Sequence, residues 1–263
     1  MRQRKLKCIL ASVTLLACFA LNMGLPLSAN GAGEGFETCK KLNWTEFGFR
    51  NQGECVALLA TGGMIWNLDS DFSISPNYAN PNPDRHGNND VWWFQYNPTG
   101  LQRDPASFVL LPNFTQVDPN REQWDDGAPA PSPFPEIGLV KNLATMVVHP
   151  DFDQLIVVGW RSPINGTVKI RGSLRHVGGV GVNSNGIRWF IDHYNGTDIS
   201  TIDSGVLDVD ESLDFGLDFT ADVNIGDFIY VSVDPRPNIG PGDADFDSTL
   251  LDLTIMGPTP PTN

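Results

Sequence analysis

The chain has 263 residues, of which 41% are hydrophobic, and its 31 Asp and Glu outnumber its 17 Lys and Arg to give a formal net charge of −14 at pH 7. A surface with this charge repels the phosphate backbone of nucleic acids and anionic membranes, so the composition argues against a nucleic-acid partner. It suits neutral or cationic ligands instead. The length fits one large domain with a short N-terminal addition better than two full domains.

Residues 1–29 have the layout of a signal peptide. Basic residues at positions 2, 4, 5 and 7 precede an apolar stretch at 8–21, and Leu27-Ser28-Ala29 supplies small residues for cleavage. The apolar stretch is short for a membrane span and no stop-transfer pattern follows, so we expect no transmembrane segment in the mature chain and a secreted, extracellular or periplasmic location. A lipoprotein is the alternative, because residues 15–18 (LLAC) resemble a lipobox.

Two cysteines, Cys39 and Cys55, remain after the signal peptide is removed. An even pair in an oxidising compartment predicts a disulfide worth about 3 kcal/mol. A metal site is disfavoured there, because no further Cys or nearby His completes a ligand set. We therefore expect residues 30–63 to form a flexible leader and a small disulfide-pinned element. Residues 39–56 resemble a short cysteine loop of exported bacterial proteins, with the match carried by Trp44, Phe47, Gly48, Asn51, Gln52, Gly53, Cys55 and Val56.

The remainder, residues 64–256, alternates apolar and polar residues in short segments separated by turn residues. This pattern predicts an all-β fold, an antiparallel β-sandwich or jelly roll. Because proline removes ladder donors, we expect a long proline-rich loop at 118–136, and we expect a disordered tail at 257–263. The predicted strands cover residues 91–96, 107–111, 145–149, 155–161, 167–174, 187–193, 212–219, 227–234 and 249–255.

Several segments in this order resemble secreted bacterial jelly-roll modules that are related to carbohydrate-binding modules. They are residues 89–96 (NDVWWFQY), His149-Pro150 before a long strand, 158–168 (VGWRSPINGTV), 225–231 (IGDFIYV) and 246–255 (FDSTLLDLTI). The resemblance covers roughly residues 70–256. It implies an exported, non-catalytic binding module whose most plausible ligand is an extracellular polysaccharide, although a shared fold does not establish a function.

Aromatic residues supply the candidate ligand contacts. Neighbours on a strand point in opposite directions, so the rings of residues 92–96 cannot all face the core. Exposed rings stack on the faces of sugar rings. We select Trp93, Trp124, Tyr194 and Arg188 as ligand-binding candidates. The alternative is that these rings pack in the core or lie under the proline-rich loop.

A group of aspartates near the C-terminus is the candidate metal site. Asp243, Asp245, Asp247 and Asp252 lie within ten residues, and such grouped oxygen donors can hold Ca²⁺. The spacing is not that of an EF-hand. In calcium-binding jelly rolls a ligand near the last strand is joined by one near the first, which suggests Asp69 or Asp71. The alternative is a solvated acidic loop.

Motifs of catalysis are weak in this chain. The four histidines stand in no His-Glu-x-x-His spacing, and no Gly-x-Ser-x-Gly motif occurs, so no catalytic residue is predicted. Paired carboxylates meet only in space, so a polysaccharide hydrolase or lyase stays open as a lesser alternative. The main alternative to carbohydrate binding is a cell-surface structural or adhesive protein with a protein partner.

Overall fold

The structure is a computed structural model that describes residues 39, 52–60, 62–72, 79–128, 134–177, 185–236 and 247–258. The predicted signal peptide, the leader and almost all of the predicted tail lie outside these residues. The start of the predicted tail differs from the expectation, because the last strand runs on through Gly257. None of the described helices is both long enough and apolar enough to span a membrane.

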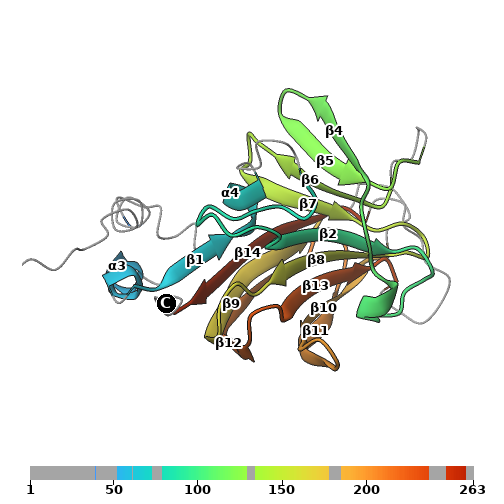
Figure 1. Ribbon diagram of the computed structural model, residues 1–263. Coiled ribbons are helices and arrows are strands. Elements are labelled where there is room, and N and C mark those ends of the chain that lie inside the picture. Colours follow the sequence, from blue (N-terminus) through green and yellow to red (C-terminus); the bar gives the residue numbers. More distant parts are fainter. Residues whose placement is uncertain are drawn as a thin grey trace, which may run out of the picture.

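Two antiparallel sheets pack face to face, which confirms the predicted all-β sandwich (Figure 1). Sheet A runs in the order β12 (Ser212–Val223), β9 (Gly166–His176), β14 (Thr249–Gly257), β7 (Thr145–His149), β6 (Glu136–Val140), β5 (Arg121–Asp125) and β4 (Asn113–Asp118), with β1 (Met64–Asn67) pairing with the second half of β14. Sheet B runs in the order β11 (Ile199–Leu207), β10 (Ile187–Tyr194), β13 (Phe228–Asp234), β8 (Leu155–Arg161), β2 (Trp92–Asn97) and β3 (Val109–Leu110).

The core lies between the sheets and is built from every second residue of their strands. In β9, Val168, Ile170 and Leu174 are fully buried, whereas Lys169 and Arg175 are exposed, as the period-two pattern predicts. The largest fully buried side chains are Trp66, Trp92 and Trp160, and the rings of Trp66 and Trp160 meet edge to face at 5.2 Å. Burial of these faces supplies the main driving force for the fold.

The prediction of one loop over residues 118–136 was wrong for its first part. Residues 121–125 form β5, which pairs with β4 on one side and β6 on the other. This segment contains no proline, because Pro119 lies in the β4–β5 turn and the other prolines begin at 129. In Figure 1 the β4–β5 hairpin forms the edge of sheet A opposite β12.

Short helices flank the sandwich. Helix α3 (Gln52–Ala60) carries Cys55, whose disulfide to Cys39 confirms the predicted pairing with a Cα–Cα distance of 5.7 Å. Helix α4 (Leu68–Phe72) follows β1 directly, and the side chain of Asn67 accepts a hydrogen bond from the Ser70 amide at its start. The single turn η1 (Pro105–Ser107) lies in the loop between β2 and β3.

Candidate ligand-binding surface

Four aromatic side chains gather on the outer face of sheet B, on the side away from the core. Trp93 projects from β2 while its neighbours Trp92 and Phe94 enter the core. Phe228 and Tyr230 project from β13, alternating with core residues, and Tyr194 projects from β10 directly opposite Phe228. Trp93, Tyr194 and Phe228 are partly exposed above a buried Tyr230, and we call these three rings the aromatic surface.

The rings are packed against one another in fixed orientations. Trp93 meets Phe228 edge to face at 5.3 Å, and Phe228 stacks on Tyr230 at 5.0 Å with 11° between the planes. Tyr194 lies 6.4 Å from Tyr230. Burial raises the pKa of the Tyr230 phenol, so this ring stays neutral and forms an apolar floor.

The polar atoms of the exposed rings are held by backbone carbonyl groups. Trp93 Nε1 donates to Asp90 O at 2.8 Å, and the Tyr194 hydroxyl donates to Gly196 O at 2.8 Å. Gly159 separates Trp93 from Tyr230 across β8, and an added Cβ would lie 3.0 Å from Tyr230 Cε1 and 3.3 Å from Trp93 Cβ. The glycine therefore lets the two rings come together.

Another part of this outer face, over β10 and β13, is covered by the loop between β2 and β3. Arg103 Nη1 donates to both carboxylate oxygens of Asp192, at 2.6 and 2.8 Å, and its guanidinium lies 3.9 Å over the ring of Phe190. Phe108 from the same loop meets Tyr230 edge to face at 5.3 Å. The aromatic surface is thus left open beside a part of the face that this loop covers.

The structure brings together two of the four ligand candidates, Trp93 and Tyr194. Arg188 lies six residues from Tyr194 along β10, which separates them by about 20 Å at the usual rise per residue. Trp124 is only 6% exposed in the core, edge to face with Phe114 at 5.3 Å, so its ring faces are not available to a ligand. Phe228, which links the two retained candidates, was missed, although the alternation of β13 could have found it.

The predicted calcium ligands do not form one group within the described residues. Asp243 and Asp245 lie outside those residues, and Asp247 is fully buried with Oδ1 3.4 Å from His176 Nε2. Burial raises the pKa of Asp252 to about 7, and the negative charges of Asp69 and Asp214 add to this effect. Asp252 therefore neighbours Asp69, but no group of three or more Asp, Glu, His or Cys in the described ranges is placed to hold a metal ion.

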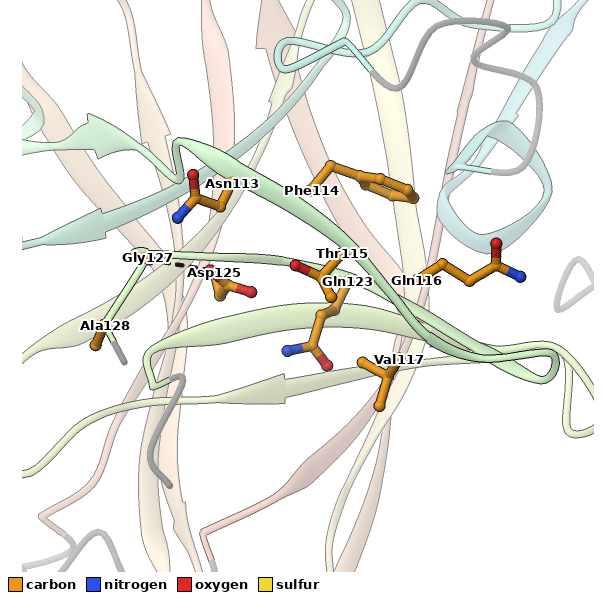
Figure 2. Close-up of a pocket in the computed structure, with 9 residues that line it drawn as sticks. All are labelled: Asn113, Phe114, Thr115, Gln116, Val117, Gln123, Asp125, Gly127 and Ala128. Atoms are coloured by element: carbon orange, nitrogen blue, oxygen red, sulfur yellow. Dashed lines mark hydrogen bonds between the residues drawn. The ribbon is translucent and has the colours of Figure 1, made fainter. Parts of the chain in front are cut away.

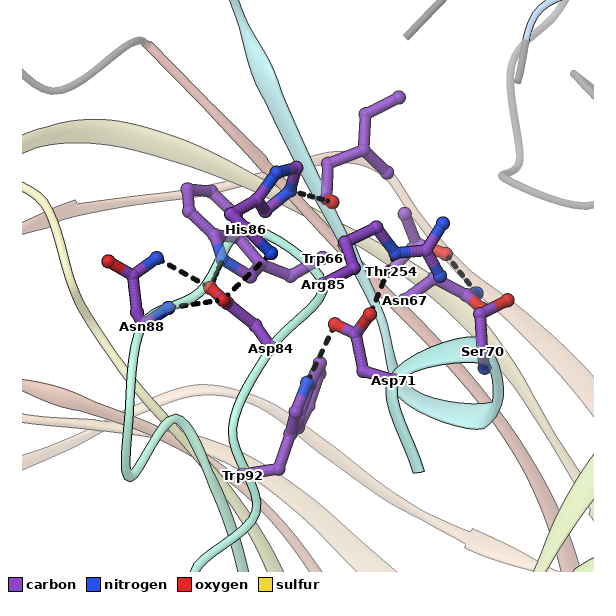
Figure 3. A network of polar contacts seen from close by, with 11 residues as sticks. Trp66, Asn67, Ser70, Asp71, Asp84, Arg85, His86, Asn88, Trp92 and Thr254 are labelled. Atoms are coloured by element: carbon purple, nitrogen blue, oxygen red, sulfur yellow. Dashed lines mark hydrogen bonds and ion pairs between the residues drawn. The ribbon is translucent and has the colours of Figure 1, made fainter. Parts of the chain in front are cut away.

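Asp71, which the sequence suggests as an alternative calcium ligand to Asp69, takes part in a buried network of polar contacts (Figure 3). Its Oδ1 accepts a hydrogen bond from Arg85 Nε at 2.7 Å and its Oδ2 accepts one from Trp92 Nε1 at 2.9 Å. Asp84 accepts from Trp66 Nε1 at 2.6 Å. Two carboxylates thus hold the loop before β2 against core tryptophans, which gives Asp71 a structural role.

No family model matches the chain, and no curated protein matches it. Among solved structures it is similar to a family 11 carbohydrate-binding module from Clostridium thermocellum in complex with a β-1,3-1,4-mixed-linked tetrasaccharide, with 10% identity, 74% of this chain and 96% of that chain covered, and a TM-score of 0.30. It is also similar to a CBM4 structure, with 11% identity, 47% of this chain and 75% of that chain covered, and a TM-score of 0.28. A family 29 carbohydrate-binding module has 10% identity, with 44% of this chain and 72% of that chain covered, and a TM-score of 0.27. TM-scores below 0.5 do not assign a function to the chain.

Proposed function

We propose that the protein is an exported, non-catalytic module that binds a carbohydrate on the aromatic surface of sheet B. The observation that supports this is the assembly of Trp93, Phe228 and Tyr194 from three strands into one partly exposed surface. Such rings offer apolar faces to the C–H groups of a sugar ring, and their fixed packing lowers the entropy cost of binding.

The electrostatics of the chain favour an uncharged ligand at this surface. The formal net charge of −14 disfavours polyanions such as nucleic acids or uronate polymers. The three rings carry no charge, and the polar atoms of Trp93 and Tyr194 are occupied by backbone carbonyl groups. A neutral polysaccharide therefore matches both the rings and their surroundings.

Retention on a panel of insoluble polysaccharides tests this proposal. We expect the mature protein to be retained on at least one neutral polysaccharide and Trp93→Ala to weaken retention roughly five- to tenfold, the effect of one aromatic contact. Phe152→Ala is the matched control, because Phe152 is exposed in a turn outside the surface. Self-association or protein capture without retention on any polysaccharide would favour the adhesive alternative, and release of reducing ends or unsaturated products would favour an enzyme.

We propose calcium as a stabilising ion near Asp252 and Asp69. The observation that supports it is the partly buried Asp252 carboxylate, whose pKa is raised by burial and by the nearby negative charge of Asp69, since a bound cation relieves like-charge repulsion. Further oxygen ligands would have to come from elsewhere, because two carboxylates do not fill a calcium shell. Calcium added to the EDTA-treated protein should raise the Tm, and Asp252→Asn should abolish the rise. Titration calorimetry with neither heat nor a change in Tm would refute this.

A further inference from the structure

A second candidate site lies on sheet A, against the β4–β5 hairpin. A cleft of about 580 Å³ opens there on sheet A and is lined by nine residues, among them Asn113, Thr115 and Val117 of β4 and Gln123 and Asp125 of β5. Figure 2 shows the side chains of Val117, Gln123 and Asp125 on one side of the hairpin, with Phe114 and Gln116 on the other. The first three leave the hairpin on the side opposite Trp124, which enters the core.

Gln123 carries the strongest indication of a ligand. The residue is only 2% exposed, and its Oε1 has no hydrogen-bond partner within the described part of the chain. A buried acceptor without a partner costs free energy, so such groups are rare in folded proteins unless water or a ligand completes them. A donor group placed in the cleft would complete this one.

The neighbouring groups complete a set of both donors and acceptors. Asp125 is 6% exposed, and its Oδ1 is oriented by the Gly127 amide, which donates to it at 3.0 Å. Gly127 has φ +83, and an added Cβ would collide with Nδ2 of Asn113, so the glycine makes room for that amide. The Asn113 amide and the Thr115 hydroxyl each donate and accept.

The charges around the cleft restrict the ligand further. Asp125 is the only charged residue among the nine that line it. The nearest cation on the same face of β5, Arg121, is paired with Glu136 of β6. An anionic ligand would meet the Asp125 carboxylate without compensation, and an ammonium group cannot accept from Asn113 or Thr115. Hydroxyl groups both donate and accept, so they match the whole set.

We propose that the hairpin cleft is a binding site for the hydroxyl groups of an uncharged sugar, separate from the aromatic surface. This inference rests on the proposed function for the class of ligand, but not for the place where it binds. The aromatic surface would hold an extended polysaccharide by ring contacts. The cleft would hold one or two sugar units of a soluble oligosaccharide by hydrogen bonds to Gln123 and Asp125.

Titration calorimetry with the full mature chain tests the site, using neutral gluco- and manno-oligosaccharides together with oligouronates as probes. Gln123→Met keeps the length of the side chain and removes the whole amide, both the unpartnered acceptor and the group that hydrogen-bonds Glu136. Gln102→Met makes the same change at an exposed position in the loop between β2 and β3. We expect Gln123→Met to weaken binding of a neutral oligosaccharide at least about tenfold, the effect of one well-placed buried hydrogen bond. Gln102→Met should leave it unchanged.

The two sites are distinguished by their separate readouts. Gln123→Met should still be retained on insoluble polysaccharide, and Trp93→Ala should still bind the soluble oligosaccharide. No heat with any neutral oligosaccharide, equal affinity in Gln123→Met, or preference for oligouronates would each overturn the cleft proposal while leaving the aromatic surface untouched. If circular dichroism shows that Gln123→Met does not fold, Asn113→Ala on the exposed edge strand replaces it. Its expected effect is a severalfold loss of affinity, and an unchanged affinity would overturn the proposal.

Discussion

The outer faces of the two sheets are built from different chemistry, although the same fold presents both. On sheet B, Val157 and Tyr230 belong to an apolar cluster that continues into the aromatic surface. On sheet A, positions of β5, β6 and β7 that face away from the core carry Gln123, Glu136 and His149, and all three are buried. The same fold thus carries an apolar outer face on one sheet and buried polar side chains on the other.

Both faces nevertheless contain a buried carboxylate paired with a half-exposed arginine. On sheet B, Asp192 has a side chain 1% exposed beside Arg103 at 30%, and on sheet A, Glu136 has one 3% exposed beside Arg121 at 36%. Asp192 is further bonded by Thr201 Oγ1 at 2.8 Å. Burial raises the pKa of Glu136, and Arg121 opposes this. The loop between β2 and β3 thus supplies the cation on sheet B, whereas on sheet A both partners of the pair belong to strands of the sheet.

Arg103→Ala should have the largest effect on stability, because it leaves Asp192 buried with only Thr201 and removes the cover over Phe190. Breaking a buried ion pair by removing one partner costs about 3 kcal/mol. Urea denaturation should show this loss, and Arg175→Ala, on an exposed position of β9, should stay within about 0.5 kcal/mol of the wild type. A loss below about 1 kcal/mol for Arg103→Ala would mean that the loop does not close sheet B.

His149 should make the stability of sheet A sensitive to acid. Burial, and then the charges of Arg121 and His176, lower its pKa to about 4, and its ring stacks on Phe134 at 3.7 Å. Between pH 6.5 and 4 the unfolded chain binds a proton that the folded chain does not, so stability present above pH 6.5 is lost as the pH falls. The expected loss over this window is on the order of 3 kcal/mol.

His149→Phe keeps a ring for stacking on Phe134 and should remove this part of the pH dependence. Denaturation midpoints measured from pH 4 to 7 give the slope for each variant. Phe152→Ala changes an exposed ring that carries no titratable group and should keep the slope of the wild type. If His149→Phe shows the same slope as the wild type, another group of the fold is responsible for the acid sensitivity.

The sequence predicts the faces of single strands well and the neighbours of those strands poorly. The outward placement of Trp93 and the burial of Ile170 follow from period two, which is a local property of a strand. The burial of Trp124 depends on β5 pairing with both β4 and β6, and the contact of Asp247 with His176 joins segments 71 residues apart, from 176 to 247. The cleft at Gln123 depends on the same pairing, so no local pattern could reveal it.

Two glycines, one on the outer face of each sheet, test whether the two faces bind their ligands separately. In β8, a Cβ at Gly159 would press on Tyr230 and Trp93, and in β6, a Cβ at Gly138 would lie 2.9 Å from both Gln123 Cβ and the Glu122 carbonyl. Overpacking of this kind costs about 1–2 kcal/mol, partly offset because alanine suits a strand better than glycine does. Gly159→Ala should therefore reduce retention on insoluble polysaccharide and spare the soluble oligosaccharide, and Gly138→Ala should do the reverse. If both variants lose both kinds of binding to the same extent, the two faces do not act as separate sites, since each glycine contacts residues of one face only.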